Sequence, residues 1–115
     1  METIQVTGTL PKIAPGDLAA FKRIAKQAMD IVKSESTTLQ YDWFFNADET
    51  QCVVRETYAN SDAALSHLGN LAELLGPLVQ LSGGVELQIF GNPSPQLREA
   101  LASMQPTVFG FFQGK

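Results

Sequence analysis

The hydrophobic pattern of this chain changes its period several times, and the order of those changes limits the folds that it can adopt. Residues 4–10 alternate apolar and polar side chains, which is typical of a strand buried on one side. Residues 18–32 instead repeat their apolar side chains at helical spacing, with charged side chains elsewhere. We therefore predict a strand followed by a surface helix, with Asp17 as the N-terminal cap of the helix.

Two further strands are predicted at residues 38–46 and 51–58. Both segments are rich in aromatic and β-branched side chains, and only four residues separate them. Such closely spaced strands pair through a short turn, so we expect a hairpin.

A second helix and a fourth strand follow the hairpin. Asn60 or Ser61 is the expected cap of a helix that runs through Leu75, and the Gly-Pro pair at 76–77 is expected to end it. A strand is predicted at residues 85–90. The resulting order, β-α-β-β-α-β, predicts an α+β fold of the ferredoxin-like type, an antiparallel sheet with both helices on one face.

The opposite face of that sheet has no predicted helix to cover it. Beyond the fourth strand, the sequence predicts a short helix with Ser94 as cap and Pro95 in its first turn, and then a short strand within residues 106–112. Three phenylalanines at 109, 111 and 112 would give a monomer an adhesive edge. We therefore expect a homodimer in which this tail packs on, or adds a strand to, a partner subunit.

Composition limits the chain to one domain and narrows the classes of partner. At 115 residues, of which 44% are hydrophobic, the chain is expected to form a single domain, 1–115. The net charge of -4 disfavours binding to nucleic acid or to anionic membranes. The N-terminus lacks the pattern of a signal peptide and no apolar run approaches the ~20 residues of a membrane span, so we expect a cytoplasmic protein.

The single cysteine and single histidine argue against a zinc site or an internal disulfide. Cys52 lies in a strand-like segment beside two valines, where a small buried hydrophobic residue is the expected role. We predict no metal site.

Residues of the hairpin can be paired by counting from its loop. Symmetric closure places residues whose numbers total 97 opposite each other, with Asp42 facing Arg55 as an ion pair. On the other face, the register predicts four pairs: Leu39 with Tyr58, Tyr41 with Glu56, Trp43 with Val54, and Phe45 with Cys52.

Three residues of this region are candidates for chemistry, each with an alternative structural role. Glu56 is the only charged side chain on an aromatic and aliphatic face, so it is either a structural hydrogen-bonding group or a catalytic one. His67 flanks the apolar stripe of the second helix, where it is either exposed, structural, or a proton-transfer group above a pocket. Trp43 is either a core aromatic residue or a platform for a ligand.

The segment from Leu39 to Asn70 resembles a known family. The residues that carry the resemblance are Leu39-Gln40-Tyr41, then Val53-Val54-Arg55-Glu56-Thr57-Tyr58, then Asn60 through Leu68 with His67 near its end. In this respect the chain is similar to antibiotic biosynthesis monooxygenase domains, including the quinol monooxygenase type.

The resemblance implies a dimeric α+β barrel with a pocket between helices and sheet. By resemblance, His67 and Glu56 would be catalytic there, and Tyr41, Trp43 and Tyr58 would bind the substrate. Family enzymes oxygenate hydroxylated aromatics or quinols with molecular oxygen and without flavin, metal or haem. The haem-degrading branch, which uses an asparagine on the first strand and a tryptophan on the second helix, is not matched, because this chain has neither.

Two hypotheses of function therefore stand. The first is a cofactor-independent monooxygenase that acts on a small, electron-rich hydroxyaromatic or quinol. The second is a non-catalytic dimeric module that binds a small molecule or associates with itself. An enclosed pocket that both Glu56 and His67 face favours the enzyme, whereas a pocket filled by Trp43, Phe45 and leucines favours the module.

Overall fold

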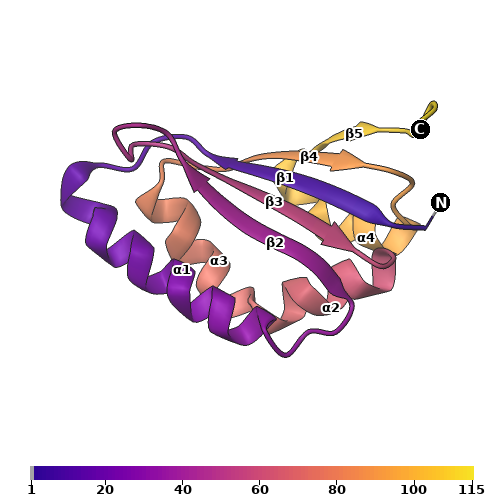
Figure 1. Ribbon diagram of the computed structural model, residues 1–115, viewed down its shortest axis with the longest axis horizontal. Helices are drawn as coiled ribbons and strands as arrows, with labels where there is room; N and C mark the ends of the chain where they lie inside the picture. Colours follow the sequence, from indigo (N-terminus) through magenta and orange to yellow (C-terminus); the bar gives the residue numbers. More distant parts are fainter. Residues whose placement is uncertain (1) are drawn as a thin grey trace.

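The computed structural model describes residues 2–115, so Met1 of the predicted 1–115 domain lies outside the described residues. A five-stranded sheet is covered on one face by the helices, as Figure 1 shows. The strands are β1 (Ile4–Leu10), β2 (Thr38–Phe45), β3 (Cys52–Tyr58), β4 (Glu86–Phe90) and β5 (Thr107–Phe109). The helices are α1 (Leu18–Val32), α2 (Ser61–Asn70), α3 (Ala72–Leu81) and α4 (Pro95–Leu101), with short 3-10 turns at Pro15–Asp17 and Ala102–Met104.

The strand order is β2-β3-β1-β4-β5, and the first four strands pair antiparallel. This order is that of a ferredoxin-like sheet with one added edge strand, so the predicted fold class is confirmed. Alternation along each strand places one set of side chains against the helices and leaves the other set uncovered. The central strand β1 follows this rule, since its helix-facing residues Ile4, Val6, Gly8 and Leu10 are all buried.

The added strand β5 completes the chain's own sheet, where it pairs parallel with β4. These three residues thus already pair with a strand of their own chain. They do not require a strand of a partner subunit, which was one form of the prediction for the tail. Beyond β5, Phe111 and Phe112 are exposed, and their packing on a partner subunit stays a prediction.

The hairpin register is confirmed at its centre and wrong at its open end. Tyr41 pairs with Glu56 and Trp43 with Val54, as predicted. A bulge between Thr38 and Gln40 shifts the pairing, so Thr38 and not Leu39 faces Tyr58. A bulge adds one residue to its strand, which cannot be counted from the loop.

The predicted ion pair between Asp42 and Arg55 is also wrong, although the two residues do lie opposite each other. The Asp42 carboxylate accepts a hydrogen bond from Gln40 at 3.0 Å, and no salt bridge joins it to Arg55 within the described chain. Both side chains are exposed on the uncovered face, where water competes with such a pair.

The predicted second helix is two helices. The break falls at Leu71, whose backbone angles of φ -101 and ψ 8 leave helical geometry, and the chain then remains helical through Gly76 and Pro77 to Leu81. Leu71 and Leu78 are both buried, so the apolar stripe continues past the proline. Burial of that stripe outweighs the one backbone hydrogen bond that a proline removes.

Two of the predicted helix caps are confirmed, and the third, Asp17, holds the N-cap position without a capping bond. The Asn60 side chain accepts from the backbone of Ala63 at 2.8 Å, and Ser94 accepts from Leu97 at 3.1 Å. Asp17 makes no such bond, because it lies in the 3-10 turn that leads into α1.

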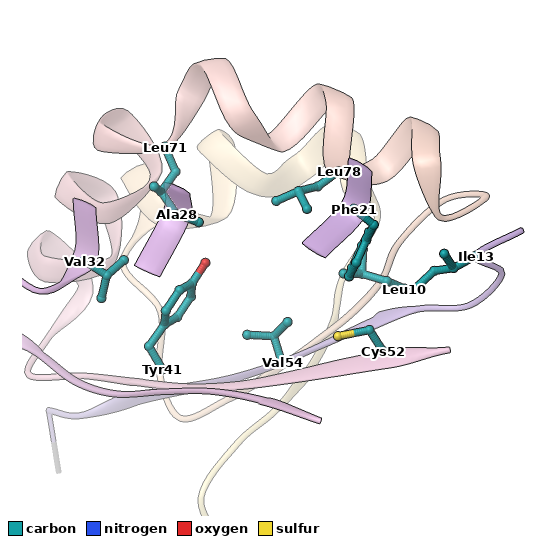
Figure 2. Close-up of a cluster of buried hydrophobic side chains, with 10 residues drawn as sticks. All are labelled: Leu10, Ile13, Phe21, Ala28, Val32, Tyr41, Cys52, Val54, Leu71 and Leu78. Atoms are coloured by element: carbon teal, nitrogen blue, oxygen red, sulfur yellow. The ribbon is translucent and has the colours of Figure 1, made fainter. Parts of the chain in front are cut away.

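The hydrophobic core lies between the sheet and the helices. In Figure 2, Tyr41, Val54 and Cys52 rise from the sheet towards Leu71 and Leu78 of the helix layer. Cys52 is fully buried, as predicted for a small core residue. A second cluster packs α2 and α4 over the other end of the sheet. Within residues 2–115, no helix is long and apolar enough to cross a membrane.

Candidate active site

The pairing of three strands places Glu56 in the middle of the helix-facing sheet surface. Glu56 lies on β3, opposite Val6 on one side and Tyr41 on the other. Its carboxylate is nearly buried, with a side-chain exposure of 15%. A carboxyl group in the centre of an apolar sheet surface is costly unless a partner supports it.

Helix α2 places His67 next to this carboxylate. The cap at Asn60 fixes the start of α2, and His67 falls in its last turn with 4% of its surface exposed. Its imidazole lies between the rings of Tyr41 and Tyr58, at centroid distances of 5.0 Å and 5.1 Å. The sequence left open whether this histidine is exposed, and the structure shows that it is buried between helix and sheet.

His67 bridges two carboxylates that are distant in the sequence. Its Nδ1 lies 2.9 Å from Oε1 of Glu35, in the turn after α1, and its Nε2 lies 3.7 Å from Oε1 of Glu56. The hydroxyl of Tyr58 donates a hydrogen bond to that same oxygen of Glu56. The result is a row of four neighbouring polar groups, Glu35, His67, Glu56 and Tyr58, at the boundary between helix and sheet.

Glu35 was not predicted from the sequence. Two more side chains hold it: Asn70 donates to its Oε2 at 2.8 Å, and Thr38 donates to its Oε1 at 2.7 Å. Burial acts to raise the pKa of Glu35, but the hydrogen bonds from Asn70, His67 and Thr38 outweigh it and lower the pKa overall. Glu35 is therefore ionised near neutral pH and accepts the Nδ1 proton of His67.

The protonation of His67 follows from burial. Loss of solvation lowers its pKa, although the hydrogen bond and the charge of Glu35 act in the opposite direction. A neutral imidazole whose Nδ1–H points at Glu35 has a free electron pair on Nε2. That nitrogen, on the Glu56 side, is able to accept a proton.

The pKa of Glu56 is shifted in the opposite direction to that of His67. Burial raises its pKa to about 7, even though the hydrogen bond from Tyr58 favours the ionised form. Near neutral pH the carboxyl group is thus present in both protonation states. Burial, followed by the charge of Glu56, raises the pKa of Tyr41 and of Tyr58 far above the usual value, so both hydroxyls stay protonated.

These groups face a cavity of about 100 Å³. That volume is several times what a single water molecule requires. The cavity lies between the sheet and helices α2, α3 and α4, and most of its walls are apolar. Its lining comprises Val6, Gly8, Leu10, Tyr41, Trp43, Val54, Glu56, Tyr58, Ala64, His67, Leu68, Leu75, Leu78, Val79, Val85, Leu87, Leu97, Leu101 and Met104.

All five candidate residues from the sequence analysis, His67, Glu56, Tyr41, Trp43 and Tyr58, line this one cavity. Trp43 differs from the others in that its indole nitrogen is buried with no hydrogen-bond partner in the described chain. Its ring packs edge-on against Phe21 and Tyr41, which is a core role as well as a lining role.

No group of three or more His, Cys, Asp and Glu side chains among residues 2–115 is arranged to hold a metal ion. The one signal that would have located Glu35 is its place in a turn that follows α1 and precedes β2. Its contact with His67 spans 32 positions, and no periodic pattern links the two.

No protein-family model matches the chain, and no curated protein sequence matches it. Several solved structures, by contrast, are similar to it. MupZ from Pseudomonas fluorescens superposes with a TM-score of 0.87 and 29% identity, over 100% of this chain and 94% of MupZ. A candidate antibiotic biosynthesis monooxygenase from Caulobacter crescentus has a TM-score of 0.68 and 24% identity, over 76% of this chain and 87% of its own.

SnoaB, a cofactor-independent oxygenase from Streptomyces nogalater, has a TM-score of 0.67 at 13% identity, over 82% of this chain and 96% of its own. At that identity the likeness concerns the fold alone. The strand order, the helices on one face and these structural matches agree with the family resemblance of the sequence. The fold of this chain is thus similar to that of solved antibiotic biosynthesis monooxygenase-like domains.

Proposed function

We propose that the protein is an enzyme that transfers protons on a small, largely apolar molecule held beside His67 and Glu56. The observation that carries this proposal is the pair itself: His67 Nε2 and Glu56 Oε1 are 3.7 Å apart on the wall of an otherwise apolar cavity. Perturbed ionisable groups in an apolar cavity are typical of catalytic sites.

Among such reactions, the fold favours cofactor-independent oxygenation of a hydroxyaromatic or quinol. His67 Nε2 takes the hydroxyl proton, and the electron-rich anion then reduces molecular oxygen. A carbon–oxygen bond forms at a ring C–H position, and the hydroperoxide loses water to leave a quinone. One oxygen molecule is consumed for each hydroxyarene, and one water molecule is released. The protein contributes the base, orientation and exclusion of bulk water.

The alternative of a non-catalytic binding module is less well supported by this site. A module would be expected to fill the space with Trp43, Phe45 and leucines. Instead a cavity is left open, and Phe45 does not line it. Burial of two carboxyl groups and a histidine around this space disfavours folding, and a purely apolar pocket would bind a hydrophobic molecule without that cost.

A redox-neutral reaction is a second candidate, and the raised pKa of Glu56 is the observation that favours it. Oxygenation needs only a base, but this site has a neutral base, His67, next to a carboxyl group whose pKa is about 7. A pair of this kind can remove one proton while it donates another, as in an isomerisation.

Aerobic incubation with a panel of quinols and naphthols tests the first candidate. Oxygen uptake and quinone absorbance should rise one for one, and His67→Ala should lower the rate by roughly 10²-fold or more. Glu73→Gln, on the exposed surface of α3, is the matched control and should keep the full rate. Unchanged oxygen across the whole panel would count against oxygenation. Incorporation of solvent deuterium into a ketone probe without oxygen uptake would favour the redox-neutral reaction.

A further inference from the structure

The cavity extends beyond its acid–base centre, the pair His67 and Glu56. Three alternate residues of β1 line it: Val6, Gly8 and Leu10. Residues four positions apart in a strand are separated by about 13 Å. Along β1 the cavity is therefore a slot that extends well past the acid–base centre.

The polar groups lie at one end of this slot. Glu56 and Tyr41 belong to the row of paired residues that contains Val6. The next row contains Leu87, Gly8, Val54 and Trp43, and all four of these residues line the cavity.

Beyond that row lie Leu10 and Val85, the latter directly before the residue that pairs with Thr9. Leu75, Leu78 and Val79 of α3 form the opposite wall. None of these residues is charged, so the slot continues from the acid–base centre as an apolar arm.

Gly8 lies where the polar end joins the arm. A Cβ atom at this position would be 3.7 Å from Leu87 Cδ1 and 3.9 Å from Glu56 Oε2, which are ordinary contact distances. The backbone of Gly8 does not have a positive φ, so its conformation does not require glycine. A glycine inside a strand weakens the strand, and its usual reason is the close approach of another group. Here the missing side chain keeps the passage above the sheet open.

We propose that the ligand has an oxygenated head beside His67 and Glu56 and an unbranched aliphatic chain that passes over Gly8 towards Leu10 and Val85. The nature of the head rests on the proposed function, whereas the chain rests on the shape and walls of the arm. Because the walls of the arm are mainly aliphatic and carry no charge, a methylene chain is the group that they fit best. Gly8 is then the residue that sets the permitted chain length.

The test is the binding of 4-alkylphenols, from ethyl to octyl, measured by calorimetry without oxygen. Each added CH₂ group should tighten binding about four-fold until the chain reaches the end of the arm, after which affinity should level off. Trp43, the only tryptophan, lines the cavity in the row of Gly8, and its ring also packs edge-on against Tyr41. Its fluorescence should therefore change on binding and give a second readout of the series.

Gly8→Val should abolish the gain in affinity from longer chains, so that 4-octylphenol binds no more tightly than 4-ethylphenol. Valine is a good strand residue, so this variant should fold, and thermal unfolding will verify that. Gly8→Ala is the matched control, and it should keep most of the chain-length dependence. Val85→Phe fills the arm from its far end and should weaken only the longest chains. A flat series in the parent protein, or an unchanged series in Gly8→Val, would overturn the proposal.

Binding and turnover separate this inference from the proposed function. Chain-dependent binding without oxygen uptake from any hydroxyarene would refute the oxygenase and leave the arm intact. Oxygen uptake that is indifferent to the alkyl chain would refute the arm and leave the oxygenase intact.

Discussion

His67 owes its chemical character to residues that the sequence keeps far from it. Ionised Glu35 fixes the proton on Nδ1, and the rings of Tyr41 and Tyr58 enclose the imidazole. Asn70, one turn along from His67 at the end of α2, and Thr38, at the start of β2, in turn hold Glu35. Three elements thus converge on one imidazole, and the direction of its free electron pair is set before any ligand arrives.

Replacement of Glu35 should therefore change the state of His67 without a direct effect on a ligand. Glu35 raises the pKa of His67 through its hydrogen bond and its charge, so Glu35→Gln should lower that pKa further and allow both neutral tautomers. Because the protein has one histidine, its ¹⁵N imidazole signals report both effects without ambiguity. The rate of proton transfer should fall by roughly 10²-fold.

Glu73→Gln removes the same charge from an exposed position and should leave the His67 signals where they are. A histidine in Glu35→Gln with the tautomer and pKa of the parent would contradict a positioning role for Glu35.

Glu56 should make stability depend on pH. Its pKa rises from 4.5 to about 7 on folding, so the folded state holds this proton more tightly than the unfolded chain does. The contribution is fully present below about pH 4.5 and is lost as the pH rises through 7. The difference corresponds to at most roughly 3 kcal/mol. In chemical denaturation at pH 5 and pH 8, Glu56→Gln should gain stability relative to the parent at the higher pH.

The comparison with Glu56→Gln at both pH values also cancels the opposite contribution of His67. The lowered pKa of His67 makes stability fall as the pH drops below the usual histidine value, in both proteins alike. A difference in unfolding free energy that stays constant with pH would show that Glu56 is ionised throughout.

Glu56 and Glu35 show which parts of the site the sequence can reveal. The place of Glu56 opposite Tyr41 follows from counting residues across a short loop, because hairpin pairing is local. The contact of Glu35 with His67 depends on how two helices and a strand meet, and local periodicity does not encode that arrangement. The burial of His67 could not be predicted for the same reason, since a position beside the apolar stripe is compatible with an exposed or a buried side chain.

At the scale of elements, strands were easier to predict than helix ends. All four predicted strands of the β-α-β-β-α-β unit form, within about two residues of the expected bounds. The predicted end at Gly76 was wrong because a local stop signal competes with an apolar stripe that continues to Leu81. The break at Leu71 follows Gly69 and Asn70, two residue types that are common at helix ends, and the Leu71 side chain is fully buried there.

Two glycines should respond in opposite directions to the same substitution. Gly76 lies inside α3 with open space around the position of a Cβ atom, so Gly76→Ala should stabilise the protein by about 1 kcal/mol through helix propensity. Gly83 has a φ of 72°, and a Cβ atom there would lie 3.2 Å from Lys12 Cβ. Gly83→Ala should destabilise by about 1 kcal/mol or more. Thermal unfolding of the two variants checks both signs, and equal shifts would contradict the assignment of Gly76 to a helix.

At the scale of the whole molecule, the two faces of the sheet are covered unequally. All the helices cover one face of the sheet, and no segment of residues 2–115 covers the other (Figure 1). The uncovered face carries polar side chains together with three phenylalanines, Phe44, Phe90 and Phe109, which are 53%, 37% and 45% exposed. The rings of Phe90 and Phe109 stack at 5.3 Å, and this pair extends the apolar surface onto the added strand β5.

We expect this face to pair with a second copy of the chain, because its aromatic side chains would otherwise remain exposed to water. Light scattering during size-exclusion chromatography should give a mass near twice 12.5 kDa over the micromolar range. Phe44→Lys places a charge within the proposed contact and should raise the monomer fraction at least ten-fold. Gln27→Lys adds the same charge on the exposed side of α1 and should leave the mass unchanged. A parent protein that is monomeric at every concentration would show that this mixed polar and aromatic face is stable in water by itself. The dimer would then be rejected, whereas the candidate active site, which lies on the helix side of the sheet, would be unaffected.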